Sequence, residues 1–215
     1  MMDDARLALV RVSAALSPGS SAELRSALRD AVDVADGDAV EEVILQGYLF
    51  AGYPAALNAF KLWRETSARA APEPVSDDPA AWAQRGPEVL GIVYGDQAAR
   101  LRENAAALHP DLERWALLEG YGKVLGRAGL DLATRELCIA ALLASLDAEP
   151  QLYAHLRGAL NAGATEEDVD AALRDGFTTG KGLGLGLGGA KRLSSEFLVE
   201  STPGQGTRVR IARWK

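Results

Sequence analysis

The sequence predicts a mainly α protein built of helical repeats, followed by a short α/β segment at its C-terminal end. Apolar residues recur at helical spacing in nearly every segment up to Leu173. Beyond Asp175 the composition changes to a glycine-rich loop and two stretches typical of strands. The first is apolar at Phe197, Leu198 and Val199, and in the second Val209 and Ile211 alternate with Arg208 and Arg210. The chain therefore divides into a helical domain, residues 1–173, and a C-terminal segment, residues 174–215.

The first part of the helical domain predicts several short amphipathic helices. One is expected over residues 3–16. Ser20 and Glu23 form a capping-box pattern that opens a second helix, and Asp38 with Glu41 opens a third.

A linker is expected at residues 66–79, where alanine, proline and acidic residues replace the helical pattern. Further helices follow it. One of them should end at His109, because the residue before a proline is disfavoured in a helix and Pro110 comes next.

The most informative stretch of the chain, residues 130–173, predicts three short helices in a row. Thr134 is expected to cap the first, which is apolar on nearly every face and therefore buried. Pro150 suits the first turn of the second helix, and Gly163 suits its C-terminal cap. Thr165 with Asp168 resembles a capping box that opens the third helix.

An internal repeat relates the two ends of the helical domain. The sequence LRSAL at Leu24–Leu28 matches LRGAL at Leu156–Leu160, and each copy is followed by a capped helix led by acidic residues. The first copy continues into QGYLFAGYPAALNAF, whereas the second stops at Leu173, where the C-terminal segment replaces its continuation.

Glu136 and His155 are the best candidates for acid–base chemistry. Two buried helices joined by a short turn can hold a carboxylate and an imidazole against each other. Structural alternatives exist for both residues: a carboxylate in the first turn of a helix is stabilised by the helix dipole, and His155 borders an apolar stripe. Cys138, in the same apolar helix, is interpreted as a buried and inert thiol.

Composition and charge restrict the possible functions. The net charge of -7 argues against a general nucleic-acid binder. The single cysteine excludes an intramolecular disulfide and a zinc site made of thiolates, and we expect neither a metal nor a cofactor. The N-terminus has no apolar core of a signal peptide, and no apolar run is long enough to span a membrane, so a cytoplasmic protein is the default expectation.

Most of the helical domain resembles the carboxymuconolactone decarboxylase family, which includes the AhpD-type alkylhydroperoxidases. The resemblance rests on EEVILQGYLFAGYPAALNAF, HPDLERW, EGYGKVL, GLDLATRELCIAALLASL and QLYAHLRGALNAGATEEDV. It implies an AhpD-like helical repeat fold and a homo-oligomer, a trimer or hexamer. In the AhpD-type branch a glutamate and a histidine serve a Cys-x-x-Cys pair, and Glu136 and His155 match the first two. The cysteine positions hold Ala148 and Gln151, so the disulfide chemistry of that branch is absent.

The resemblance therefore implies the decarboxylase branch, with cofactor-free decarboxylation or proton transfer on a small carboxylated lactone or related acid. His155 would be the general acid, and Glu136 would orient it. Arg135 or Arg157 could bind the substrate carboxylate, and the sequence does not choose between them. The alternative is a non-catalytic oligomeric binding module of the same fold.

The C-terminal segment resembles the last part of a GHKL-type ATPase of the anti-sigma-factor serine kinases. The resemblance rests on TTGKGLGLGLGGAKRL and FLVESTPGQGTRVRIARW. Gly182, Gly184 and Gly186 would form the phosphate-binding loop, running into a short helix at residues 190–193. The family's magnesium-binding helix and adenine loop have no counterpart upstream, so we expect a fragment that does not bind ATP by itself. A flexible glycine linker and an ATP-binding kinase fragment are the alternatives.

Overall fold

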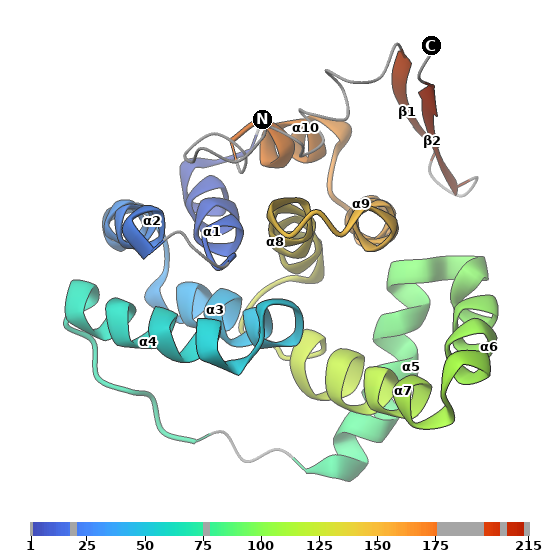
Figure 1. Cartoon of the computed structure of the whole chain (residues 1–215), viewed down its shortest axis with the longest axis horizontal. Coiled ribbons are helices and arrows are strands. Elements are labelled where there is room, and N and C mark those ends of the chain that lie inside the picture. Colours follow the sequence, from blue (N-terminus) through green and yellow to red (C-terminus); the bar gives the residue numbers. More distant parts are fainter. Residues whose placement is uncertain (1, 18–20, 75–77, 176–195, 203–205, 213–215) are drawn as a thin grey trace.

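The computed structural model describes residues 2–17, 21–74, 78–175, 196–202 and 206–212. This part of the chain is mainly α-helical, as the sequence predicts (Figure 1). The helices are α1 (Asp4–Ala14), α2 (Ser21–Val34), α3 (Gly37–Ala51), α4 (Tyr53–Ser67), α5 (Pro79–Tyr94), the 3₁₀ turn η1 (Gly95–Gln97), α6 (Ala98–Leu108), α7 (Pro110–Trp115), the π-helix η2 (Ala116–Leu125), α8 (Leu132–Ser145), α9 (Glu149–Asn161) and α10 (Glu166–Asp175). The strands β1 (Glu196–Thr202) and β2 (Gly206–Ala212) pair antiparallel.

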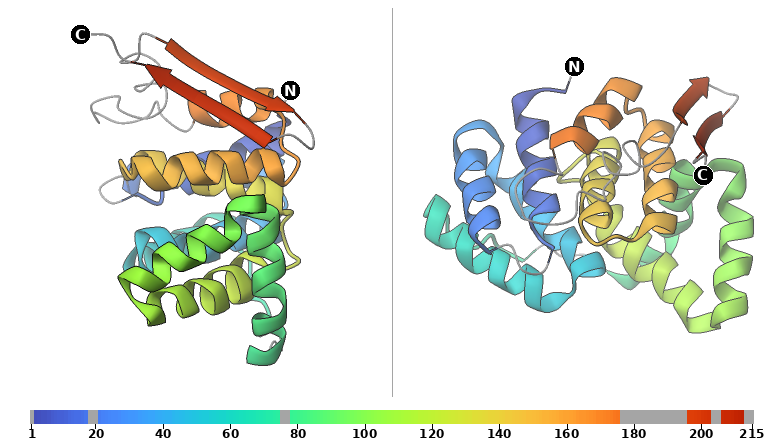
Figure 2. Two further views of the ribbon diagram at one scale, coloured as in Figure 1. Left: turned by 90° about the vertical axis from the view of Figure 1, so that its right-hand side faces the viewer. Right: turned by 45° about the horizontal axis from the view of Figure 1, so that its top comes forward.

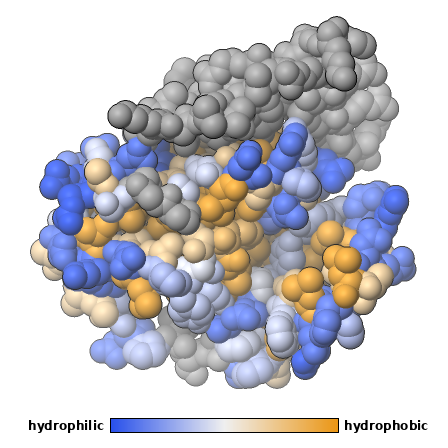
Figure 3. Space-filling model, in the orientation of Figure 1, coloured by the Kyte–Doolittle hydropathy of each residue, from blue (hydrophilic) through white to orange (hydrophobic). Residues whose placement is uncertain are grey.

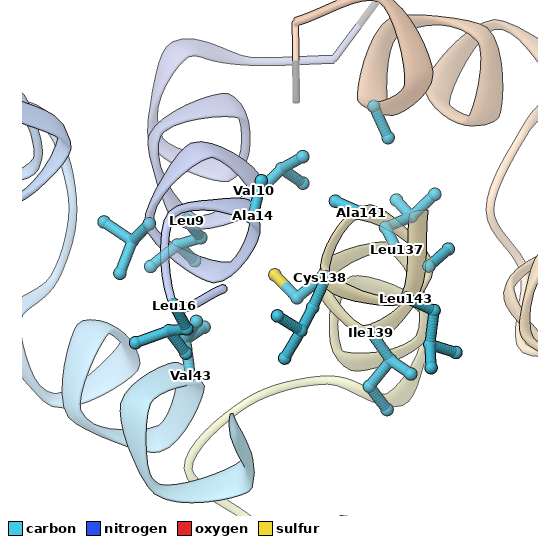
Figure 4. Packing of buried hydrophobic residues seen from close by; sticks show 14 of the residues in the cluster. Leu9, Val10, Ala14, Leu16, Val43, Leu137, Cys138, Ile139, Ala141 and Leu143 are labelled. Atoms are coloured by element: carbon cyan, nitrogen blue, oxygen red, sulfur yellow. The ribbon is translucent and has the colours of Figure 1, made fainter. Parts of the chain in front are cut away.

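Helix α8 forms the centre of the core. Every residue from Ala133 to Ala144 is buried, which the uniformly apolar sequence predicts. Figure 4 shows apolar side chains of α1, among them Val10 and Ala14, facing Leu137 and Ala141 of α8. The hydroxyl of Ser13 donates a hydrogen bond of 2.7 Å to the carbonyl of Cys138, so this buried hydroxyl has a partner.

The internal repeat corresponds to two similar sets of helices around α1 and α8. Helices α1, α2 and α3 form the first set, and α8, α9 and α10 form the second. Helix α3 packs on both α1 and α8, and α10 packs on both α8 and α1. The first set continues into α4, which lies against α2 and α3 (Figure 1).

The second half of the fold is a group of helices that begins with α5, and residues 68–74, which precede it in the described part of the chain, form no helix or strand. This segment follows α4 and leads to α5, close to the expected linker (Figure 1). Helix α5 packs closely on η2, and glycines make this possible. A Cβ atom at Gly86 would collide with the carbonyl of Leu117, and one at Gly122 with the carbonyl of Trp82. His109 lies between α6 and α7, where its Nδ1 accepts a hydrogen bond of 3.1 Å from the backbone N–H of Asp111.

The strands form a hairpin beyond α10. Figure 2 shows the hairpin on the side of the molecule where α9 and α10 lie, and β2 packs near α9. The predicted phosphate loop, Gly182, Gly184 and Gly186, and the helix expected at 190–193 lie outside the described residues. The same holds for Ser20, the predicted cap of α2.

The structure corrects two predicted helix starts. Thr134 does not cap α8, because the helix begins at Leu132 with Asp131 as its N-cap. The Asp131 carboxylate accepts hydrogen bonds from the backbone N–H of Thr134 at 2.9 Å and from its hydroxyl at 2.7 Å. Helix α3 likewise begins earlier than predicted, after Asp36, which accepts from the N–H of Asp38. In both cases an aspartate two or three residues before the predicted start is the better acceptor for the free N–H groups of the first helical turn.

The predicted signals around α9 and α10 are confirmed. Pro150 lies in the first turn of α9. Gly163 follows the last residues of that helix with a φ of 106°, a backbone conformation that side chains rarely adopt. Thr165 and Asp168 exchange the two hydrogen bonds of a capping box, each of 3.2 Å.

Candidate functional site

The structure brings Glu136 of α8 and His155 of α9 into direct contact. The Oε2 atom of Glu136 lies 2.8 Å from Nδ1 of His155. The Glu136 side chain is fully buried, and the His155 side chain is 7% exposed. A buried carboxylate accepts the proton of Nδ1–H, which leaves Nε2 as the nitrogen that can exchange a proton with a ligand. We refer to this pair as the Glu136–His155 dyad.

Gly158, one turn beyond His155 on α9, makes room for the carboxylate. A Cβ atom built at Gly158 would lie 3.1 Å from the carboxyl carbon of Glu136 and 2.7 Å from Cγ1 of Val93, and closer still to Glu136 Oε2. A larger residue would therefore displace the carboxylate or separate α9 from α5. Sequence reasoning did not single out Gly158, although a glycine inside a helix, where the matching repeat has Ser26, was a usable signal.

The second oxygen of the Glu136 carboxylate lacks a hydrogen bond among the described residues. Oε1 is fully buried and has no partner there. A buried carboxylate oxygen without a donor is costly, so such an atom is expected to meet a water or a ligand group. The ring of Phe50 lies edge-on to His155, with centroids 5.6 Å apart and an interplanar angle of 88°, and forms an apolar wall beside the imidazole.

Two tyrosines near the dyad form a hydrogen-bonded pair. The Tyr121 hydroxyl donates to the Tyr94 hydroxyl at 2.9 Å, and the rings meet edge to face. Burial raises the pKa of both phenols, and the charge of Glu136 raises each pKa further. The Tyr121 donor and the charge of Arg157 oppose this rise at Tyr94. Tyr94 therefore stays protonated beside Glu136.

The expectation that Arg135 could bind a substrate is corrected by its surroundings. Its side chain is fully buried. The guanidinium donates to Glu42 Oε2 at 2.7 Å, to Gln46 Oε1 at 3.1 Å and to the carbonyl of Arg127 at 3.0 Å. Glu42 and Gln46 hold α8 to α3 through this guanidinium, which is inaccessible to a ligand. The alternative, Arg157, is exposed on α9.

Glu42 is shared by two guanidinium groups in this network. Its carboxylate contacts Arg135 at 2.7 Å and Arg127 at 2.8 Å. Burial by itself would raise the pKa of Glu42, but the hydrogen bonds and charges of both arginines outweigh it and lower the pKa. Glu42 is therefore ionised at neutral pH.

Comparison with known proteins identifies the family of the chain. Residues 110–182 match the carboxymuconolactone decarboxylase family, a range that includes both members of the dyad. Peroxisomal protein 2 of Schizosaccharomyces pombe is 32% identical over 155 residues, which are 68% of this chain and 70% of that protein. The chain belongs to the carboxymuconolactone decarboxylase family.

Two shorter similarities add detail. The 4-carboxymuconolactone decarboxylase of Acinetobacter baylyi is 32% identical over 87 residues, which are 40% of this chain and 65% of that enzyme. The serine/threonine-protein kinase RsbT of Bacillus subtilis is 45% identical over 47 residues, 22% of this chain and 35% of that kinase. The chain thus spans about a third of the kinase's length, and the GHKL resemblance has only this short match behind it.

Cys138 does not supply the redox thiol that some members of the carboxymuconolactone decarboxylase family use. Its side chain is fully buried in α8, and burial raises the pKa of the thiol far above its ordinary value. Ala148 and Gln151 occupy the positions matched to the family's cysteine pair. Within the described ranges, no group of three His, Cys, Asp or Glu side chains is placed so that it could hold a metal ion. None of the helices in these ranges is long and apolar enough to cross a membrane.

Proposed function

We propose that this protein is a cofactor-free decarboxylase, or a related proton-transfer enzyme, that acts on a small carboxylated lactone or a related acid. The observation that carries the proposal is the buried Glu136–His155 dyad, with Nδ1 held by the carboxylate and Nε2 left for chemistry. Family membership and the similarity to a 4-carboxymuconolactone decarboxylase support this class of reaction.

The reaction needs a proton donor for the substrate carbon that loses CO2. Breaking the bond to the leaving CO2 places its electron pair on the substrate as an enolate. His155, in its imidazolium form, gives the Nε2 proton to the enolate carbon and is then reprotonated from solvent. Glu136 orients the ring and stabilises its positive charge, and Phe50 limits access of water.

Arg157 is the remaining candidate for binding a substrate carboxylate. Arg157 is exposed, and its positive charge partly offsets the rise in the pKa of the Tyr94 phenol. Arg157 lies two residues beyond His155, so the two side chains leave α9 in different directions.

The test is CO2 release from 4-carboxymuconolactone and a panel of related acids. We expect His155→Ala to lower turnover by about 10²–10⁴-fold and Glu136→Gln to lower it by less. Tyr153→Phe is the matched control, because this phenol also contacts a carboxylate, that of Glu149, but at the exposed surface of α9. Unchanged turnover in His155→Ala would remove His155 from the mechanism. If the wild-type chain releases no CO2 from any member of the panel, a non-catalytic binding module is the better interpretation.

We also propose that a second copy of the chain covers the surface of α6 and α7. Neither helix has a buried residue, and Leu108, Leu112 and Trp115 are 80%, 51% and 56% exposed. Figure 3 shows apolar residues gathered on the side of the molecule where these helices lie. An exposed apolar surface of this kind is typical of an interface, which supports the homo-oligomer that the sequence predicts.

A further inference from the structure

A second pocket lies between α3, α4 and η2. Its volume is about 190 Å³. The rings of Tyr48, Tyr53 and Phe60 form much of its wall, and Lys123 and Arg127 are the charged residues that line it. Glu136, His155 and Phe50 do not line this pocket, and the proposed reaction does not use it.

The volume and the wall limit the size and kind of ligand. An apolar protein cavity of about 150 Å³ is large enough for benzene, so this pocket accommodates one six-membered ring with a small substituent. The rings of Tyr48 and Tyr53 lie 4.9 Å apart with a tilt of 38°, and their faces and edges suit a planar or alicyclic ring.

Each cation at the pocket is paired with a carboxylate, and the weaker of the two pairs can admit an anion. The chain has a net charge of -7, yet both charged residues lining the pocket are cations. Arg127 is engaged by Glu42 at 2.8 Å and fixes one side of the wall. Lys123 lies 3.8 Å from Glu119, with the two side chains 39% and 44% exposed. An ion pair so long and so exposed is weak, so a ligand carboxylate can replace Glu119 at the ammonium group.

Glu119 itself is held in place by another contact. Its Oε1 accepts a hydrogen bond of 2.8 Å from the Tyr48 hydroxyl. The Lys123 ammonium also lies 5.3 Å from the centre of the Trp82 ring, a cation–π contact that keeps it beside the pocket. The cation therefore remains near the pocket when its carboxylate partner is exchanged.

We propose that this pocket binds a small cyclic monocarboxylate, with its ring among Tyr48, Tyr53 and Phe60 and its carboxylate on Lys123. The site is separate from the dyad, so the proposal does not depend on decarboxylase activity.

The experiment is a ligand-observed NMR titration of the full chain with benzoate and with benzyl alcohol, its neutral counterpart of similar size. We expect benzoate to bind with a Kd of about 1 mM and about tenfold more tightly than benzyl alcohol. Lys123→Gln should abolish this difference, and Glu119→Gln should tighten benzoate binding because it removes the competing carboxylate. Arg114→Gln, which removes an exposed cation on α7, should change neither affinity.

Four results would overturn the proposal. The first is equal or undetectable binding of the two probes to the wild-type chain, and the second is unchanged benzoate affinity in Lys123→Gln. The third is loss of benzoate binding in His155→Ala, which would assign the anion to the dyad. Ala56→Leu, which fills the pocket, should weaken both probes while a melting curve reports on its fold; undiminished binding to the folded variant would also contradict the assignment.

Discussion

Replacing Gly158 by alanine tests the packing that forms the dyad. In an open helical position this change stabilises a protein by about 1 kcal/mol, because alanine has the higher helix propensity. At Gly158 the new methyl group would lie 2.7 Å from Val93 Cγ1 and 3.1 Å from the Glu136 carboxyl carbon, both shorter than ordinary contact distances. Overpacking a buried site costs about 1–3 kcal/mol, and loosening the hydrogen bond from His155 adds about 1 kcal/mol. We therefore expect Gly158→Ala to lower the free energy of unfolding by about 2 kcal/mol.

Urea unfolding measures this free energy, and Gly91→Ala is the matched control. Gly91 also lies inside a helix, α5, but a Cβ atom there would meet nothing within 4 Å. Gly91→Ala should raise the free energy of unfolding by about 1 kcal/mol, opposite in sign to Gly158→Ala. The chain has two histidines, so NMR can follow the His155 ring with His109 as the internal reference. If both variants are stabilised alike and the His155 signal does not move, the close approach of Glu136 to α9 is refuted.

Three further predictions follow from the described contacts. Glu42→Gln should lower stability by about 3–5 kcal/mol at neutral pH, because it leaves the buried Arg135 without its carboxylate. Since the pKa of Glu42 is lowered from 4.5 in the folded state, its contribution is present above that pH and lost as the pH falls further, so urea unfolding should show the variant and the wild type converging in acid. Cys138 should react with a thiol reagent only at the rate of unfolding, and fast modification of the native chain would contradict its burial. Leu112→Glu with Trp115→Glu should reduce the mass measured by light scattering, and an unchanged mass would contradict the proposal that a second copy covers α6 and α7.

The positions of the helices were largely predictable, because each depends on a local pattern. The apolar run of α8 predicts a buried helix, and Pro150 and Gly163 mark the two ends of α9. Cap residues were less certain because several acceptors compete for the same N–H groups. Asp131 and Thr134 lie three residues apart, and the hydroxyl of Thr134 donates to the Asp131 carboxylate rather than capping the helix itself.

The candidate site was predictable only in part, because its main features depend on contacts between distant segments. The spacing of two helices and a turn predicts that Glu136 and His155 can meet. The role of Arg135 could not be predicted locally, since its partners Glu42 and Gln46 lie on α3. The π-helix η2, which presents Tyr121 to Tyr94, also gives no simple periodic signal in the sequence.

Arg135 and Glu136 are neighbours on α8, and this explains why one belongs to a structural network and the other to a candidate site. Successive helical residues point about 100° apart, so two adjacent charged side chains enter different interfaces. Arg135 extends toward α3 and Glu42, which also pairs with Arg127 in the wall of the second pocket. Glu136 extends toward α9 and His155. Glu42 therefore links the wall of the pocket to α8 at the residue next to Glu136, although the pocket and the dyad share no lining residue.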